Sequence, residues 1–188
     1  MRAGFARLVG FVVACLTIPG CLQNAVHSVT GARQMNPDSA HAIVVIGIAL
    51  DAAWPFAVFS LTLDEYSVEK QNTTGNCFRY NHIAATRPSS PAKVTYFAYK
   101  VPAGTYVYSS FNANADLVQS AVGSAFIAPP GRTVYFGDYV FVGNRTIEFR
   151  SDIAAARLGI RALLARGAVL EQAEPTTTAR VHGFLCTP

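Results

Sequence analysis

Short runs of Val, Ile, Tyr and Phe recur roughly every ten residues along this chain, and Gly and Pro turns separate them. Hydrophobic residues make up 51% of the 188 residues and charged residues 14%, which indicates one domain with a substantial core and excludes disorder for most of the chain. We therefore predict a mainly β fold, an antiparallel β-sandwich of about eight or nine strands. The expected strands lie in 42–63, 77–84, 93–101, 105–111, 124–128, 133–142, 146–150, 168–173 and 179–185.

Two turns are expected to close hairpins, because each lies between two of these runs and contains glycine, which can adopt positive φ. They are Pro102–Gly104 and Pro129–Arg132. Segment 86–92 contains two prolines and is predicted to be a loop. Segment 175–178 is predicted to separate the last two strands.

One late α-helix is predicted over 152–166. Ser151 or Asp152 can cap its start, and Gly167 lies at the stop position. One apolar stripe has helical periodicity and comprises Ile153, Ala156, Ile160, Leu163 and Leu164. Arg157 and Arg161 flank the stripe. They are interpreted either as a basic contact for lipid headgroups or an acidic partner, or as a solvated rim.

The apolar segment 42–63 is long enough to cross a membrane, so a transmembrane helix is one alternative. However, Asp51 lies near its centre, where a charge costs at least about 2.5–3.5 kcal/mol. The second half alternates, with Phe59 and Leu61 among the apolar positions. Two strands joined by a turn at Asp51–Pro55 are therefore predicted instead.

The N-terminus has the layout of an export signal. Arg2 and Arg7 precede the apolar run Leu8–Ile18, which covers only roughly 16 Å of a hydrocarbon core of about 30 Å. The following Ile18–Cys21, which reads IPGC, resembles the lipobox of bacterial lipoproteins. That resemblance implies cleavage before Cys21 and acylation of its thiol and new amine. The alternative is an ordinary signal peptide in which Cys21 is incidental.

The predicted organisation is a signal peptide at 1–20, a lipidated tether at 21–41 and a β-sandwich domain at 42–188 that includes the helix. In Gram-negative lipoproteins an Asp after the acylated Cys retains the protein in the inner membrane, so Leu22 implies the outer membrane. Several acyl chains, each contributing about 0.8 kcal/mol per buried CH₂, would make the anchoring stable.

The remaining cysteines and charges fit export. Cys77 and Cys186 make one pair, which predicts a disulfide in an oxidising compartment, and two free thiols are the alternative. Loss of 1–20 removes Arg2 and Arg7, so the formal net charge falls from +4 to +2. No nucleic-acid partner is expected from so small a charge.

Two turn motifs carry a second resemblance. Val101–Tyr106 reads VPAGTY, and Pro130–Asp138 reads PGRTVYFGD. These motifs and the helix after them, about residues 94–166, resemble a group of uncharacterised bacterial lipoproteins with a transthyretin- or immunoglobulin-like sandwich. The resemblance implies that fold and transfers no catalytic residues.

Metal and nucleophile motifs are sparse. The four histidines, at 27, 41, 82 and 182, have no partner ligands at metal-binding spacing, apart from His182 near Cys186. Ser67–Lys70 matches the SxxK pattern of penicillin-recognising enzymes, but its companion motifs are missing, and a chance match in a charged turn is favoured. No metal and no cofactor are predicted.

Carboxylates and tyrosines offer two further candidate sites. The carboxylates available for glycosidic chemistry are Asp64, Glu65, Asp138, Glu148 and Asp152, and the pattern singles out no pair; Asp138 is expected to stabilise a turn or bulge. A binding patch would form if several tyrosines of adjacent hairpins shared an exposed face, the alternative being a half-buried sheet surface. Those tyrosines are Tyr96, Tyr99, Tyr106, Tyr108, Tyr135 and Tyr139.

The sequence thus predicts a non-enzymatic cell-envelope lipoprotein, anchored in the outer membrane through Cys21, that serves as a structural or protein-interaction module with an envelope protein as partner. Two alternatives remain open. One is a periplasmic enzyme or enzyme inhibitor acting on cell wall or glycan, and the other is a carrier of a small ligand.

Overall fold

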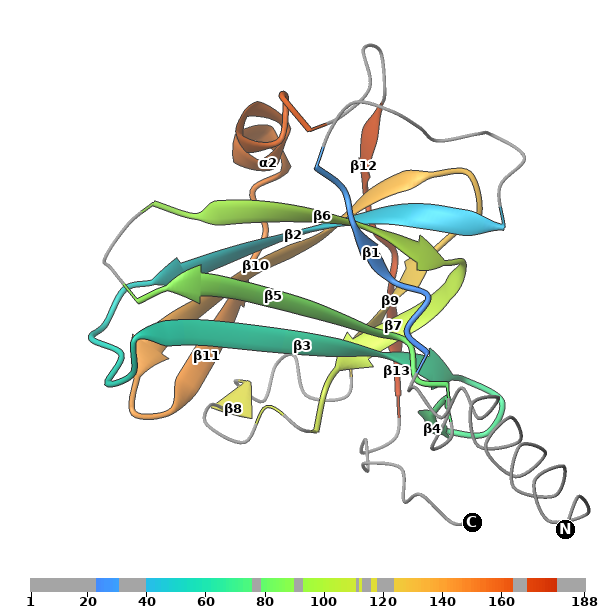
Figure 1. Ribbon diagram of the computed structural model, residues 1–188, viewed down its shortest axis with the longest axis horizontal. Coiled ribbons are helices and arrows are strands. Elements are labelled where there is room, and N and C mark those ends of the chain that lie inside the picture. Colours follow the sequence, from blue (N-terminus) through green and yellow to red (C-terminus); the bar gives the residue numbers. More distant parts are fainter. Residues whose placement is uncertain are drawn as a thin grey trace, which may run out of the picture.

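The computed structural model describes residues 23–30, 40–75, 79–89, 93–110, 112, 116–117, 124–163 and 169–178. These residues form two β-sheets and one helix, α2 (Ile153–Gly159) (Figure 1). The seven-stranded sheet has the order β1 (His27–Ser28), β6 (Thr95–Pro102), β2 (His41–Leu50), β10 (Thr133–Gly143), β11 (Thr146–Arg150) and β8 (Asp116–Leu117), with β12 (Leu170–Gln172) paired to β10. The six-stranded sheet has the order β13 (Pro175–Thr177), β9 (Ser124–Ala128), β7 (Gly104–Tyr108), β3 (Val58–Ser67) and β4 (Asn72–Thr73), with β5 (His82–Pro88) paired to β3.

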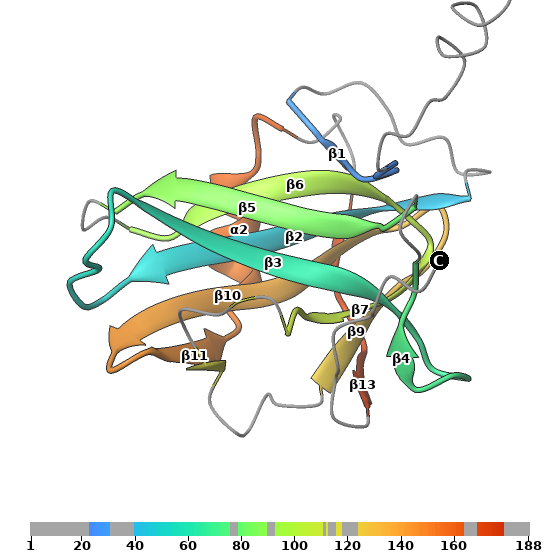
Figure 2. The ribbon, with the colours of Figure 1, turned by 60° about the horizontal axis from the view of Figure 1, so that its bottom comes forward.

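The two sheets pack face to face around the main hydrophobic core (Figures 1 and 2). Alternate side chains of β3, including Phe59 and Leu61, meet those of β2 and β10, including Ile46 and Phe136. Helix α2 covers the outer face of the seven-stranded sheet, where Ala156 and Ile160 pack with Tyr135. The prediction of a mainly β fold with one helix is confirmed for the described residues.

Strand β2 explains the apolar run that starts at residue 42. Its even-numbered side chains, such as Val44 and Ile46, face the main core, whereas Ile43 and Val45 face α2. A strand covered on both faces needs apolar residues throughout, without alternation. The prediction of two strands in 42–63 is therefore confirmed by β2 and β3. Among the described residues, no helix has the length and hydropathy needed to cross a membrane.

The expectation of a purely antiparallel sandwich is wrong. Strand β10 runs parallel to β2 along Thr133–Phe141 and parallel to β12, and β11 runs parallel to β8. Parallel neighbours need long connections, and along the sequence most strands of the six-stranded sheet lie between β2 and β10. Glycine and proline spacing gives no information on the direction of such remote pairs.

Both predicted hairpins are also wrong. Pro102–Gly104 leads from β6 in the seven-stranded sheet to β7 in the six-stranded sheet, and Pro129–Arg132 leads back from β9 to β10. Two hydrogen bonds hold the first crossing. The Tyr106 hydroxyl donates to the Pro102 carbonyl oxygen at 2.9 Å, and the Ala103 amide donates to the carbonyl oxygen of Ala40, which precedes β2. These turns therefore connect the two layers instead of folding one sheet back on itself.

The hairpin between β10 and β11 is a genuine one. Its two turn residues, Asn144 and Arg145, both have positive φ, at 50° and 57°. The predicted bulge near Asp138 is present at Gly137, where the β10–β2 register shifts and φ is 141°. A Cβ on Gly137 would lie 2.3 Å from the Phe149 ring, so only glycine fits.

Several predicted boundaries move. The strand expected at 77–84 overlaps β5 only from His82, and β5 continues to Pro88 into the segment predicted as the 86–92 loop. The segment 175–178, predicted as a connection, contains β13. The last strand expected, 179–185, lies outside the described residues.

The helix starts as predicted and ends early. The Asp152 side chain accepts a hydrogen bond from the Ala155 amide, which confirms one of the two predicted caps. The helix stops at Gly159 rather than near Gly167, and turn structure follows to Leu163. A Cβ on Gly159 would lie 2.2 Å from the Tyr96 ring, so the last turn lies directly on β6. Glycine permits this close approach and favours a helix end.

The described part of the expected tether is folded onto the domain. Residues 23–30 include β1, which pairs with β6, and the Val29 amide donates to the Ala98 carbonyl oxygen at 2.8 Å. The segment differs from a structureless linker because its side chains supply hydrogen bonds that apolar periodicity does not signal. The rest of the expected tether that is described, Ala40 and His41, leads directly into β2.

Candidate functional site

The three cysteines with predicted roles, Cys21, Cys77 and Cys186, lie outside the described residues. Their nearest described neighbours in sequence include Gln23 and Arg79, and these two residues form an isolated parallel bridge. The Tyr80 amide donates to the Gln23 carbonyl oxygen at 3.0 Å. The first described residues are therefore attached to the end of the domain that holds β4 and the start of β5.

The two buried candidate carboxylates, Asp64 and Asp138, do not lie together. Asp64, on β3, is fully buried and accepts hydrogen bonds from the hydroxyls of Tyr80 and Ser109. Burial raises the pKa of Asp64 despite these two donors. Because both oxygens are already bound by protein hydroxyls, this carboxylate is suited to holding strands together rather than to proton transfer with a substrate.

The second buried carboxylate, Asp138, lies on the other side of the core. It faces the helix layer, whereas Asp64 points away from the core on the six-stranded sheet, so the two are not a pair across a cleft. Its Oδ2 is 3.5 Å from the Tyr96 hydroxyl, and its Oδ1 has no hydrogen-bond partner in the described part of the chain. Burial raises the pKa of this carboxyl as well. Within the described ranges, no group of three or more His, Cys, Asp or Glu is placed to hold a metal ion.

Two other sequence candidates have structural roles. Ser67 ends β3, and its hydroxyl accepts a hydrogen bond from the Lys70 amide at 3.2 Å, which closes a turn rather than presenting a nucleophile. The tyrosine patch is absent because its members belong to different sheets and most are buried. Tyr99, Tyr106, Tyr135 and Tyr139 are each 6% exposed or less.

The predicted basic contact of the helix is divided between two arginines. Arg157 donates to the Leu170 carbonyl oxygen at 3.0 Å and so joins α2 to β12. Arg161 is exposed, as is the neighbouring Leu158. Of the two predicted alternatives for these arginines, this arrangement fits a solvated rim of the helix better than a basic contact for an anionic partner.

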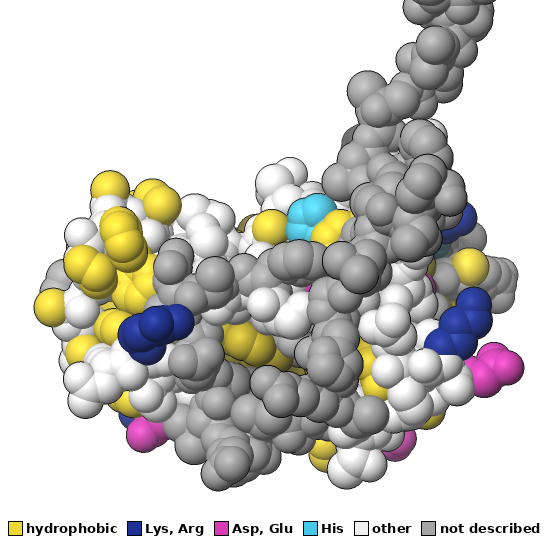
Figure 3. Space-filling model, turned by 90° about the horizontal axis from the view of Figure 1, so that it is seen from below, with side chains coloured by type: hydrophobic (Ala, Val, Ile, Leu, Met, Phe, Trp, Pro, Cys, Tyr) yellow, Lys and Arg dark blue, Asp and Glu magenta, His cyan; other side chains and the backbone are white. Residues whose placement is uncertain are grey.

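An aromatic surface occurs where the sequence predicts only a turn. The segment Trp54–Val58, which we call the β2–β3 tip, exposes 56% of Phe56 and 51% of Val58. Hydrophobic side chains gather at this end of the molecule (Figure 3, left). The sequence does contain an indication of this surface, because turns are usually polar and this one combines Trp and Phe. An apolar turn is expected either to be covered by other residues or to bind a partner.

The tip is held in place from beneath. The Trp54 ring packs edge-on against Phe59 and Phe141, with centroids 4.8 and 4.9 Å apart, and against Phe56 at 5.6 Å. Its indole N–H donates to the Val58 carbonyl oxygen at 2.8 Å. An exposed aromatic surface with a fixed conformation loses little entropy on binding, which suits it to protein recognition.

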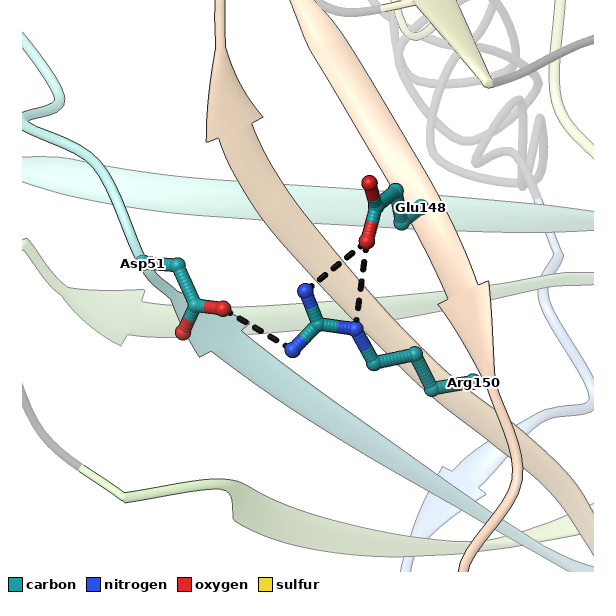
Figure 4. Close-up of polar contacts among 3 residues, drawn as sticks. All are labelled: Asp51, Glu148 and Arg150. Atoms are coloured by element: carbon teal, nitrogen blue, oxygen red, sulfur yellow. Dashed lines mark hydrogen bonds and ion pairs between the residues drawn. The ribbon is translucent and has the colours of Figure 1, made fainter.

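Charged residues lie beside the tip at the end of β2. Arg150, on β11, makes ion pairs of 2.8 Å with Asp51 and with Glu148 (Figure 4). All three side chains are about half exposed, so the pairs contribute at most about 1 kcal/mol to stability. An apolar centre with a polar margin is the usual anatomy of a protein–protein interface.

Comparison with known proteins adds no assignment to this geometry. The chain matches no family model, and neither a curated protein nor a solved structure matches it.

Proposed function

We propose that this chain is a lipid-anchored protein of the bacterial envelope, and that it binds a protein partner through the β2–β3 tip. The role is one of binding, not catalysis. The anchor is Cys21, the membrane is the outer membrane, and the two-sheet domain is of the transthyretin- or immunoglobulin-like type. The sequence supports these parts of the proposal through the lipobox-type signal, through Leu22 and through the two turn motifs.

One observation carries the binding role. Phe56 and Val58 are more than half exposed although they adjoin a packed aromatic cluster of Trp54, Phe59 and Phe141. Exposing them costs hydrophobic free energy, about 25 cal/mol for each Å² of apolar surface, which a partner would recover. The β2–β3 tip is aromatic and lies beside ion pairs. The partner that fits it best is a protein with an apolar pocket and a polar margin.

A site-specific crosslink tests the proposal. The exposed Ala53 is replaced by a photoreactive benzophenone amino acid in the full chain, and cells are irradiated. We expect one adduct of defined mass in the envelope fraction, and we expect Val58→Ser to abolish it because the central apolar contact is lost.

The matched control is Val169→Ser, since Val169 is also exposed, at 66%, but precedes β12 and is not part of the tip. The adduct is expected to persist in that variant. An adduct equally weakened by both substitutions, or an adduct with phospholipid alone, would contradict a protein partner at the tip.

Asp64 and Asp138 give the enzymatic alternative no support, because these two buried carboxyls lie on opposite sides of the core. Activity against cell wall or glycan would need two carboxyls within about 5–9.5 Å of each other across a cleft.

A further inference from the structure

The starting point is how tightly the chain after Cys21 is attached to the domain. The Asn24 side chain pairs with the backbone of β5 at His82, as a residue of a neighbouring strand would. Its Nδ2 donates to the His82 carbonyl oxygen at 2.9 Å, and its Oδ1 accepts from the His82 amide at 3.2 Å. The next residue, Ala25, donates its amide to Asn81 Oδ1 at 3.0 Å.

The acceptor of that last bond is itself fixed. Asn81 donates to Glu65 Oε2 at 2.8 Å, and the Thr74 hydroxyl donates to the same oxygen at 2.8 Å. The Thr74 amide and the Glu65 carbonyl oxygen form a further bond of 2.8 Å. The N-terminal segment is therefore attached to a network that joins β3, β4 and β5 at one end of the domain.

Chain length then limits where a lipid on Cys21 can lie. Two residues span at most about 7 Å, so the backbone of Cys21 lies within that distance of Gln23 and the acyl groups begin a few ångströms beyond it. A free tether of about 20 residues would instead have an end-to-end distance of about 25 Å and would leave the orientation of the domain open. The hydrogen-bonded segment removes most of that freedom.

The end of the domain that holds β4 and the start of β5 also presents apolar and charged side chains to solvent. The β3–β4 turn, Val68–Gln71, presents an apolar side chain, Val68, that is 46% exposed, and the exposed ammonium of Lys70 beside the exposed carboxylate of Glu69. Arg79 is exposed and forms the bridge with Gln23. An ammonium binds phosphate oxygens, and its aliphatic stem tolerates the interface.

We propose that this surface, made of Gln23, the Val68–Gln71 turn and Arg79, lies against the headgroups of the membrane that holds the acyl chains, so that the β2–β3 tip points away from that membrane. The inference rests on the proposed lipid anchor. The proposed membrane-facing surface and the β2–β3 tip lie toward opposite ends of the long axis of the molecule. Strand β4 marks one end, and the β2–β3 connection marks the other (Figures 1 and 2).

The single tryptophan of the chain provides the test, because Trp54 lies in the tip. The acylated full-length protein is inserted into phosphatidylethanolamine and phosphatidylglycerol vesicles whose acyl chains carry bromine near the headgroups. We expect Trp54 fluorescence to be the same with and without bromine. In the variant Trp54→Phe with Val68→Trp, we expect the bromine to remove most of the fluorescence.

A release variant tests the attachment itself. Asn24→Ala with Asn81→Ala, in the Val68→Trp background, is expected to lose much of the quenching. The control is Asn112→Ala, since Asn112 pairs with the amide and carbonyl of Thr62, at 2.9 and 2.8 Å, as Asn24 does with those of His82. That variant is expected to keep the full quenching.

The outcomes separate this inference from the proposed anchor. Intact mass without acyl chains would refute the anchor. Acylated protein in which Val68→Trp is not quenched, in which Trp54 is quenched instead, or in which the release variant behaves like Asn112→Ala would refute the orientation alone.

Discussion

The fit between Gly47 and Asp138 gives the sharpest stability prediction. Gly47 lies in the middle of β2, directly opposite Asp138 in the register of β10. A Cβ on Gly47 would lie 2.0 Å from Asp138 Oδ1 and 2.7 Å from Val94 Cγ1. Relief to ordinary contact needs a shift of more than 1 Å in a buried carboxylate between two central strands.

The size of the effect follows from these contacts. Overpacking in a core costs about 1–3 kcal/mol, and we place Gly47→Ala at about 3 kcal/mol because the obstructing Asp138 carboxylate is itself buried and has little room to move. For a chain of this size that corresponds to a fall in Tm of about 6–12 °C. The control is Gly104→Ala, because a Cβ there meets only Glu65 Oε1 at 3.6 Å; its change is expected within about 0.5 kcal/mol.

A double-mutant cycle tests the cause. Asp138→Ala removes the obstructing oxygen, so the cost of Gly47→Ala in that background is expected to fall by about 1–2 kcal/mol, with the Val94 contact remaining. Urea unfolding, followed by circular dichroism, measures all four free energies of unfolding. An unchanged cost in the Asp138→Ala background, or an equal cost for Gly104→Ala, would refute the packing argument.

Three further predictions follow from single features. Burial raises the folded-state pKa of Asp64 above its value of 3.8 in the unfolded chain, so its contribution to stability is full below that pH and is lost as pH rises through the folded pKa. The stability of Asp64→Asn relative to wild type should therefore increase from acidic to neutral pH in urea titrations, and a constant difference would contradict this. Arg145→Gly should raise the free energy of unfolding by about 1 kcal/mol, because φ is 57° there; a loss of stability in thermal melts would count against it. Intact mass and peptide mapping of the envelope protein should show acylated Cys21 and a Cys77–Cys186 disulfide, whereas a Cys21–Cys77 disulfide would exclude both.

Strand positions were predictable because local residue preference marks them, but strand partners were not. The run in β2 and the alternation in β3 correctly predict two strands. The turn at Pro102–Gly104 has the same composition whether the chain returns to its own sheet or crosses to the other. That choice depends on remote partners, such as the pairing of β7 with β3, and no local pattern encodes them.

The candidate sites show the same limit. Asp64 and Asp138 were visible as carboxylates, but only the fold separates them by the core and buries each one. The role of Asn24 cannot be predicted from its polar segment, because a single amide that pairs with a strand edge leaves no periodic signal. The sequence predicts a turn at the tip, but the conformation of the tip depends on how Phe59 and Phe141 support Trp54 from two different sheets.

Strand β3 connects the two proposed surfaces directly. It begins at Val58 in the tip and ends at Ser67, next to the Val68–Gln71 turn. Ten residues at about 3.3 Å each extend roughly 30 Å, so on the proposed orientation the tip is held about that far from the headgroups. Because β3 pairs along its length with β5 and β7, the spacing is rigid. A partner bound at the tip would therefore be held at a fixed distance from the membrane, which a flexible tether could not achieve.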